Sequence, residues 1–187
     1  MKRLFDILAA ACGLVVLWPV ILVAGLLVRR ESEGPAIFSQ ARVGREARVF
    51  TCYKLRTMRK DTAHVPTHMA AASAVTPLGE KLRRWKLDEL PQLWNVVTGE
   101  MSLVGPRPCL PTQTELIAER QRRGVLAVRP GITGLAQVQN IDMSDPVRLA
   151  IVDADYVATQ SFVGDLKLIL ATVTGRGIGI DQVRRGS

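Results

Sequence analysis

The sequence predicts a mixed α/β protein in which helices dominate, strands are short, and a re-entrant helix-hairpin dips into a membrane at the N-terminus. An apolar run without a charge fills residues 7–28, amphipathic helical segments recur along the rest of the chain, and alternating strand patterns are short. About 157 residues follow residue 30, which is enough for one domain with a real core and too few for two.

The apolar run from Ile7 to Val28 is long enough to cross a bilayer, which takes about 20 such residues. Pro19 lies near its middle, where proline kinks a helix. Lys2-Arg3 precede the run and Arg29-Arg30 follow it. Because positive residues stay on the cytoplasmic side, we expect a hairpin that keeps both pairs there. A straight spanning anchor and a cleaved signal peptide are the alternatives.

Two short strands, Ala36 to Phe38 and Arg48 to Tyr53, bracket a turn at Gly44 and predict a β-hairpin. Three later segments have helical patterns, with expected bounds 78–85, 112–123 and 166–174. Gly124 is expected to end the second helix; Asp165 is expected to cap the start of the third. Short apolar stretches at 125–128 and 135–138 flank a loop at 129–134, and Gly175 is expected to close the last helix.

The net charge of +8 and the pI near 10.0 point to anionic partners, such as lipid head groups, diphosphates or nucleic acid. Aromatic residues make up only 5% of the chain and no nucleic-acid motif is present, so nucleic acid is the least favoured of these. The composition of segment 61–76 predicts a loop, and Pro66 interrupts the helical spacing of His64 and His68, so a metal site there is not favoured. The three cysteines show no metal or redox spacing.

Two adjacent carboxylates, Asp88 and Glu89, come just before a proline. The residue before a proline avoids the α region, so Leu90 is expected to end the preceding segment, and Pro91 then suits the first turn of a helix over 91–97. A helix N-terminus favours negative charge, which supports either a site for anion chemistry or ordinary capping by acidic residues. The chain has neither a GxGxxG fingerprint nor a GxxxxGK[ST] phosphate loop.

The order of longer motifs is specific. They are Lys2-Arg3 with Phe5-Asp6, Gly34 to Gln40, Tyr53 to Met58, Thr76 to Gly79, Leu87 to Asn95, Gly99 to Pro108 and Arg129 to Gln137. With these motifs the chain closely resembles the bacterial sugar transferase family, the small monotopic phosphoglycosyl transferases. The resemblance covers nearly the whole chain and leaves only the tail uncovered.

The resemblance implies an enzyme that moves a sugar 1-phosphate from a UDP-sugar to a polyprenyl phosphate such as undecaprenyl phosphate, releasing UMP. This is the first membrane step of surface glycan assembly. By the same resemblance Asp88 would be the nucleophile that forms a covalent phosphosugar intermediate, and Glu89 would act as a base or position its neighbour. Mg²⁺ would sit at Asp88 and the diphosphate.

Cations must offset the repulsion between a carboxylate and an anionic phosphate. The candidates for substrate binding are Lys54, Arg56, Arg83, Arg107 and Arg129. Arg107 and Arg129 each stand beside a proline, in stiffened loops that would present their planar forks to phosphate oxygens.

The resemblance also implies a domain plan and a location. The expected parts are a re-entrant membrane anchor at 1–30, a catalytic domain at 31–175 and a basic tail at 176–187. The enzyme would be monotopic, on the cytoplasmic face of the bacterial inner membrane. A homodimer is kept as an option for its assembly.

The chain departs from the family pattern at three places. Trp18-Pro19 replaces the usual Ser-Pro, Lys86 replaces a common Ser, and Val138 to Asp142 replaces a frequent Gly-Arg pair. The last region bears on the choice of sugar, so the donor sugar cannot be carried over. Two other classes of function stay open: a non-enzymatic basic membrane scaffold, and a hydrolase that releases UMP without a lipid acceptor.

Overall fold

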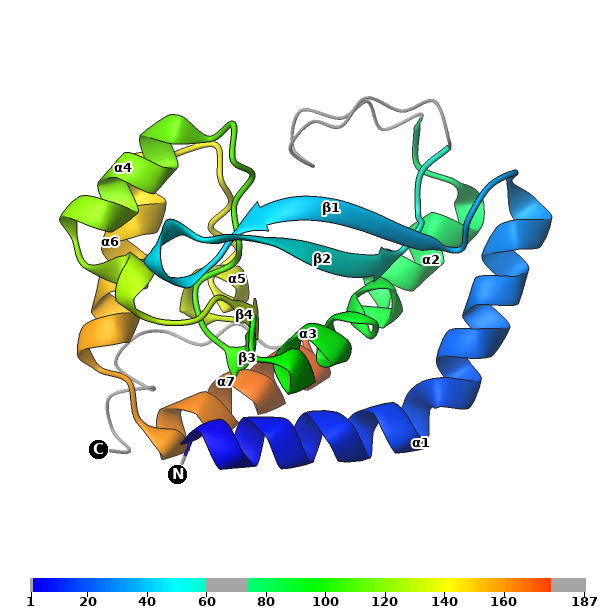
Figure 1. The fold of residues 1–187 in the computed structure, drawn as a ribbon, viewed down its shortest axis with the longest axis horizontal. Helices are drawn as coiled ribbons and strands as arrows, with labels where there is room; N and C mark the ends of the chain where they lie inside the picture. The colour runs from blue at the N-terminus through cyan, green and yellow to red at the C-terminus, as the bar shows by residue number, and fades with distance from the viewer. Residues whose placement is uncertain (1, 60–73, 176–187) are drawn as a thin grey trace.

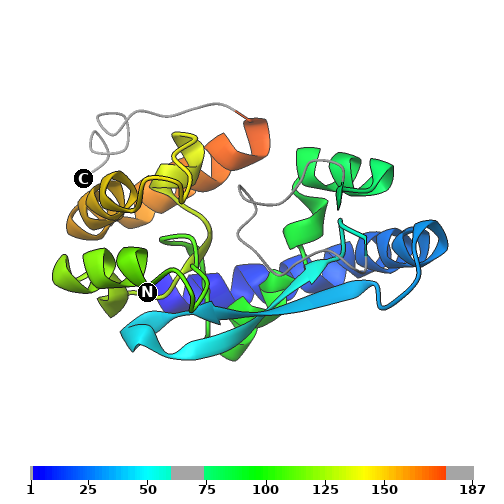
Figure 2. The same cartoon turned by 90° about the horizontal axis from the view of Figure 1, so that it is seen from above.

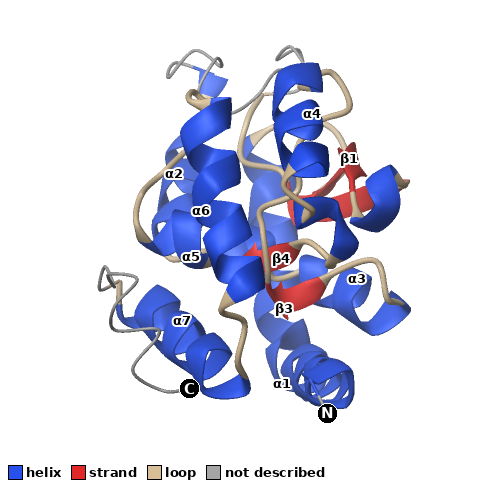
Figure 3. Ribbon diagram, turned by 90° about the vertical axis from the view of Figure 1, so that its left-hand side faces the viewer, coloured by secondary structure: helices blue, strands red, loops and turns tan. Residues whose placement is uncertain are grey.

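The computed structural model describes residues 2–59 and 74–175, and helices dominate it (Figures 1 and 3). Its helices and 3₁₀ turns are α1 (Lys2–Glu31), η1 (Arg45–Ala47), α2 (Pro77–Arg84), η4 (Leu87–Glu89), α3 (Gln92–Thr98), α4 (Thr114–Arg122), η5 (Val125–Ala127), α5 (Leu135–Val138), α6 (Pro146–Ala158) and α7 (Phe162–Thr174). Its strands are β1 (Ile37–Val43), β2 (Val49–Leu55), β3 (Ser102–Val104) and β4 (Gly131–Thr133). The helix-dominated, mixed α/β prediction is therefore confirmed. The predicted tail, and most of the predicted loop with His64 and His68, lie outside the described residues.

The N-terminal apolar segment forms one continuous helix, α1, where a hairpin of two helices was expected. Its axis turns partway along (Figure 1), and Pro19 accounts for such a bend because proline removes a helix hydrogen bond. Trp18 and Val20 flank this proline, and neither residue favours a turn, so the chain bends without reversing.

Both halves of α1 pack against the rest of the chain. Ala10 joins a buried cluster with Leu93 of α3, and Val28 joins another with Leu55 of β2. By length and composition α1 could cross a membrane, yet only 11% of its apolar window is buried. The helix is therefore not a core helix, and it presents a long apolar face to its surroundings.

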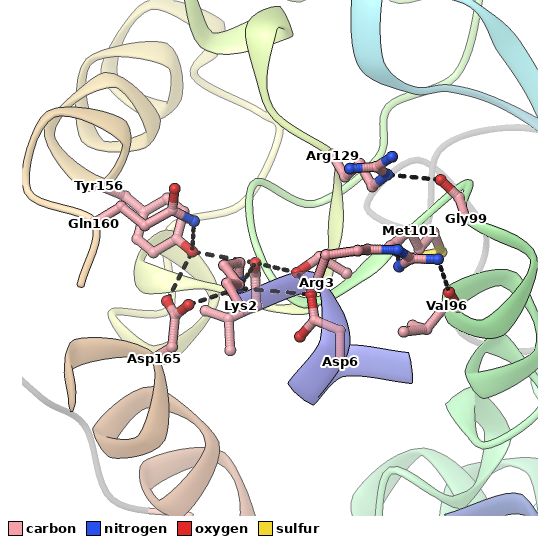
Figure 4. A network of polar contacts seen from close by, with 12 residues as sticks. Lys2, Arg3, Asp6, Val96, Gly99, Met101, Arg129, Tyr156, Gln160 and Asp165 are labelled. Atoms are coloured by element: carbon pink, nitrogen blue, oxygen red, sulfur yellow. Dashed lines mark hydrogen bonds and ion pairs between the residues drawn. The ribbon is translucent and has the colours of Figure 1, made fainter. Parts of the chain in front are cut away.

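Charged side chains fix the first turn of α1 in place (Figure 4). Lys2 Nζ donates hydrogen bonds to Asp165 Oδ2 at 2.6 Å and to the Val104 carbonyl at 3.3 Å. Arg3 donates to the Val96 carbonyl at 2.7 Å, at the end of α3. The start of α1 is therefore bound to α3, β3 and α7 (Figure 4).

The predicted β-hairpin is confirmed, with longer strands than expected. β1 and β2 pair antiparallel from Ile37 opposite Leu55 to Val43 opposite Val49. The hairpin runs from the α4 end of the molecule to the α2 end (Figures 1 and 2). It carries Lys54, near the end of β2, towards the acidic pair.

A second, parallel pair of strands was not predicted. β3 and β4 join Ser102 to Gly131 and Val104 to Thr133, so part of the expected loop at 129–134 is a strand. Three-residue strands are too short to show a period in the sequence. A Cβ on Gly131 would lie 2.1 Å from the Gly105 nitrogen, so this close approach requires glycine. The contact holds the segment that leads to Arg107.

The expected helices at 78–85 and 112–123 are confirmed as α2 and α4, and α6 was missed. The predicted cap of the last helix was wrong. α7 begins earlier, and Ser161 Oγ caps it by accepting from the Gly164 N–H at 3.1 Å. Asp165 lies inside the first turn, where its carboxylate accepts hydrogen bonds from Lys2 and Tyr156. Gly175 ends the helix with a φ of 66°, as expected.

Candidate active site

The two adjacent acids lie in η4, a single 3₁₀ turn between α2 and α3. Lys86, just before it, has a left-handed φ of 57°, which ends α2 and redirects the chain. Leu90 has helical angles of −55° and −37°, so the expectation that it leaves the α region was wrong. Its N–H closes the turn by a hydrogen bond to the Leu87 carbonyl, and this bond overrides the preference set by the following proline. Asp88 and Glu89 are both buried in front of α3.

Glu89 is held by two cations. Its Oε1 accepts a hydrogen bond from Lys54 Nζ at 2.9 Å and another from Arg107 Nη2 at 2.9 Å. Burial alone would raise the pKa of Glu89, but Arg107 and Lys54 together push it far below its ordinary value. Burial lowers the pKa of Lys54, whereas the charge of Glu89 raises that of Arg107. Glu89 is therefore a fixed anion that orders two cations.

Asp88 has different surroundings. Among the described residues no donor makes a hydrogen bond to its carboxylate, although its side chain is buried. Burial, followed by the charge of Glu89, raises the pKa of Asp88, and nearby Lys54 and Arg83 offset only part of this rise. A buried carboxylate without a hydrogen-bond partner is a stronger base and nucleophile than a solvated one.

The structure brings three of the five candidate cations to the acidic pair. Lys54 and Arg107 bind Glu89 directly. Arg83 donates from Nε to Thr57 Oγ1 at 2.9 Å, and its charge acts on Asp88.

The other two candidate cations have other partners. Arg56 donates from Nη2 to the Ser32 carbonyl at 2.6 Å, and no described residue is a partner of its buried Nε and Nη1. Arg129 donates from Nε to the Gly99 carbonyl at 2.7 Å, at the end of α3 opposite the acidic turn and beside Arg3 (Figure 4). The substrate-binding roles of Arg56 and Arg129 stay predictions.

Two arginines that the sequence did not single out support the Arg107 loop. Arg42 Nη1 donates to the Pro108 carbonyl at 3.0 Å, and Arg120 Nη1 donates to the Arg107 carbonyl at 2.8 Å. Arg120 also forms a buried ion pair with Asp153 of α6. Arg120 sits in an ordinary amphipathic helix and α6 was not predicted, so the sequence offered no signal for this pair.

Magnesium fits the acids only with help from a substrate. The described residues contain no group of three or more His, Cys, Asp or Glu that could hold a metal ion. Both cations bind Oε1 of Glu89, so Glu89 Oε2 and the Asp88 carboxylate are the oxygens of the pair without a hydrogen bond among the described residues. Mg²⁺ is commonly bound by one or two carboxylates together with substrate phosphates. Asp88 and a diphosphate match that pattern.

Known proteins resemble this chain over nearly all of its length. A family model described as bacterial sugar transferase matches residues 1–176. One relative is the UDP-glucose:undecaprenyl-phosphate glucose-1-phosphate transferase of Caulobacter vibrioides, with 40% identity over 181 residues. That match covers 92% of this chain and 68% of the relative.

Two further relatives differ in how much of them the chain covers. The undecaprenyl-phosphate glucose phosphotransferase of Komagataeibacter xylinus is 36% identical over 185 residues, or 92% of this chain, but the match spans only 35% of that protein. The exopolysaccharide production protein PSS of Rhizobium leguminosarum bv. phaseoli is 38% identical over 189 residues, which are 92% of this chain and 93% of that protein. With a family match from the first residue to the end of α7, the chain belongs to the bacterial sugar transferase family.

Proposed function

We propose that this enzyme transfers a sugar 1-phosphate from a UDP-sugar to undecaprenyl phosphate and releases UMP, through a covalent intermediate on Asp88. The observation that carries the proposal is that the two adjacent acids have different surroundings. Glu89 is neutralised by two cations, whereas Asp88 is buried beside them and has no hydrogen-bond partner in the part of the chain that the structure describes. Relatives named as undecaprenyl-phosphate transferases for glucose or glucose 1-phosphate support the same reaction class.

The reaction has two displacement steps at one phosphorus atom. An oxygen of the Asp88 carboxylate attacks the phosphorus that bears the sugar, the bond to the bridging oxygen breaks, and UMP leaves with the electron pair. An oxygen of the lipid phosphate then attacks the same phosphorus. The bond to Asp88 breaks, and the carboxylate is restored. Neither step requires a proton from the protein.

Glu89 acts in this scheme by positioning. Its lowered pKa makes it a poor general base, but it holds Lys54 and Arg107 close to Asp88. These two cations offset the charge of the incoming diphosphate. Magnesium at Asp88, when bound, supplies further positive charge to the diphosphate oxygens.

The proposed function is tested by UMP release from detergent-solubilised protein with magnesium, undecaprenyl phosphate and a panel of UDP-sugars. UMP that depends on both the lipid and one sugar is the expected result, and it names the donor. UMP release without lipid would indicate a hydrolase. No release with any sugar, together with no magnesium-dependent thermal stabilisation by a UDP-sugar, would favour the scaffold.

The pH dependence of donor use follows from the two carboxyl pKa values. Asp88 must be ionised to attack, and its pKa lies above the ordinary value of 3.8. As pH falls, Asp88 therefore takes up a proton before Glu89 does, and kcat/KM for the donor should fall along a single acid limb. Because Mg²⁺ bound at Asp88 would itself lower the pKa of this carboxyl, the pH profile is measured at decreasing magnesium concentrations and the limb is extrapolated to zero magnesium. A limb centred at or below 3.8 would contradict the assignment of Asp88.

We also propose that α1 enters the membrane from the cytoplasmic side and returns to it. Lys2 and Arg3, at the start of α1, bind residues of the folded part of the chain that follows Glu31. Both ends of α1 are therefore attached to the same folded part of the protein. A straight span would separate the two ends of the helix by the bilayer. The bend near the middle and the cations at both ends suit a shallow, re-entrant path.

Accessibility of tags tests this topology. Tags at the N-terminus and the C-terminus should both stay protected from protease in sealed, right-side-out vesicles, and both should be cut once the vesicles are opened. Cleavage of the N-terminal tag alone in sealed vesicles would show a spanning helix.

A further inference from the structure

A cavity of about 300 Å³ lies beside the acidic turn, between α3, β4, α5 and the end of α7. Its volume is at the lower end of the range for small-molecule sites. Apolar side chains form one part of its wall: Leu90, Leu93, Ile132, Val138, Ala171 and Val173. Glu89 and Lys86 also line it, so one part of the cavity reaches the reacting groups.

Three of the polar side chains of the wall, Thr133, Gln137 and Thr172, make hydrogen bonds within it, whereas Asn140 is exposed at its edge. The hydroxyls of Thr133 and Thr172 form a hydrogen bond, and Gln137 Nε2 donates to the Ile132 carbonyl at 2.8 Å. Gln137 Oε1 is buried and has no partner among the described residues. A sugar ring placed against the apolar part of the wall would leave the hydroxyls on that side without a hydrogen bond, which is costly.

The cavity connects the acidic turn to the membrane helix. Leu93 lines it and also packs against α1, where its Cδ1 lies 3.2 Å from the position of a Cβ on Gly13. Val173, on the opposite wall, is 79% exposed and stands at the rim. Lys86 adds one cation at the edge nearest the acids, and its charge acts on Glu89. A cavity with an apolar wall, a cation at one end and a membrane helix alongside matches an isoprenyl chain that carries a phosphate.

We infer that this cavity binds the isoprenyl units of the lipid acceptor nearest its phosphate, with Lys86 holding the phosphate beside Asp88. The inference rests on the proposed function and adds a subsite to it. The apolar chain fills the wall formed by Leu90, Leu93 and Val138. The second displacement, in which lipid phosphate attacks the intermediate, therefore depends on this cavity, whereas the first does not.

The test compares two matched variants of α7. Val173→Asp places a charge on the cavity rim, whereas Leu170→Asp places one on the same helix at a residue that is 63% exposed and does not line the cavity. Both sites are exposed, so both variants should fold. In a two-step displacement kcat/KM for the donor reports the first step, and kcat/KM for the acceptor reports the second. For Val173→Asp we expect acceptor kcat/KM to fall about tenfold with donor kcat/KM unchanged, and Leu170→Asp should change neither.

Other results would overturn the inference. Equal losses for the two variants would show that α7 contacts membrane lipid in general, and a loss in donor kcat/KM alone would place the sugar in the cavity. Geranyl phosphate, a short acceptor, separates the cavity from membrane partitioning, because Val173→Asp should impair its use as well. Lys86→Met should lower acceptor kcat/KM about tenfold by removing the charge–phosphate contact.

A binding measurement keeps this test separate from the proposed function. A geranyl phosphate that carries a diazirine on its first isoprenyl unit should cross-link to the segment around Leu90 or Val138, whether or not the protein turns over. Cross-links confined to α1 would overturn the cavity inference. Absence of lipid-dependent UMP release by the wild type would count against the proposed function alone.

Discussion

Asp88→Asn should abolish lipid-dependent UMP release, with a loss of at least about a thousandfold in kcat. The amide has the shape of the carboxylate but lacks the charge and the nucleophilic oxygen. Because the pKa of Asp88 is raised by burial and by Glu89, the ionised carboxylate is destabilised in the folded protein. Its loss should therefore not weaken the fold, and the thermal midpoint should stay the same or rise. UMP release and a thermal melt in the same detergent measure the two effects.

Glu80→Gln is the matched control for this substitution. Glu80 lies on α2, is exposed and, among the residues at 2–59 and 74–175, pairs with Arg84 alone at 3.4 Å, so its neutralisation should leave turnover unchanged. The intermediate gives a second readout: radiolabelled sugar phosphate from the donor should remain on denatured wild-type protein in the absence of lipid, and none should remain on Asp88→Asn. Label retained by the variant would assign the nucleophile to another residue.

The sequence predicted the helices and strands that have a regular pattern of apolar residues or a residue that marks their end. The β-hairpin around Gly44, α2 after Thr76 and α4 before Gly124 were found because alternation, amphipathic spacing and helix caps are local features. The β3–β4 pair was missed because its partners are three residues each and are far apart in the chain. A hairpin was expected in place of the single helix α1 because a proline inside an apolar run indicates a break. The path of the helix along the protein is set by contacts with distant residues such as Leu93 and Leu55, which the local sequence does not reveal.

The sequence identified most residues of the candidate site, but it did not predict which of them contact one another. Adjacent acids before a proline drew attention to Asp88 and Glu89, but nothing in that pattern tells which acid is neutralised. That difference arises from Lys54 and Arg107, which reach Glu89 from 35 and 18 residues away. Arg129 looked equivalent to Arg107 because both stand beside proline, yet it binds a carbonyl at the far end of α3.

Asp153→Asn should lower the free energy of unfolding by about 3 kcal/mol and the thermal midpoint by about 10 °C. Arg120 Nε and Nη2 both donate to Asp153 Oδ2, at 3.0 and 2.7 Å, and both side chains are 3% exposed. Burial raises the pKa of Asp153 although Arg120 offsets part of the rise, so the expected loss comes from Arg120: its guanidinium stays buried without a counterion, which is costlier than loss of a surface pair. Urea unfolding and a thermal melt measure this, and Glu80→Gln, at an exposed pair, should change stability by less than about 0.5 kcal/mol.

The same substitution should also reduce activity, because Arg120 Nη1 holds the Arg107 carbonyl at 2.8 Å and thereby fixes a cation of the active site. A double replacement separates the two effects. Arg120→Met with Asp153→Leu removes the unpaired charge and fills the space with apolar groups, so stability should recover. The Arg107 carbonyl would then lose its Arg120 donor altogether, so kcat/KM for the donor, measured well below the thermal midpoint, should be low. If the stabilised double variant regained full activity, Arg120 would serve the fold alone and the position of Arg107 would depend on Glu89 and on the glycine contact between Gly105 and Gly131.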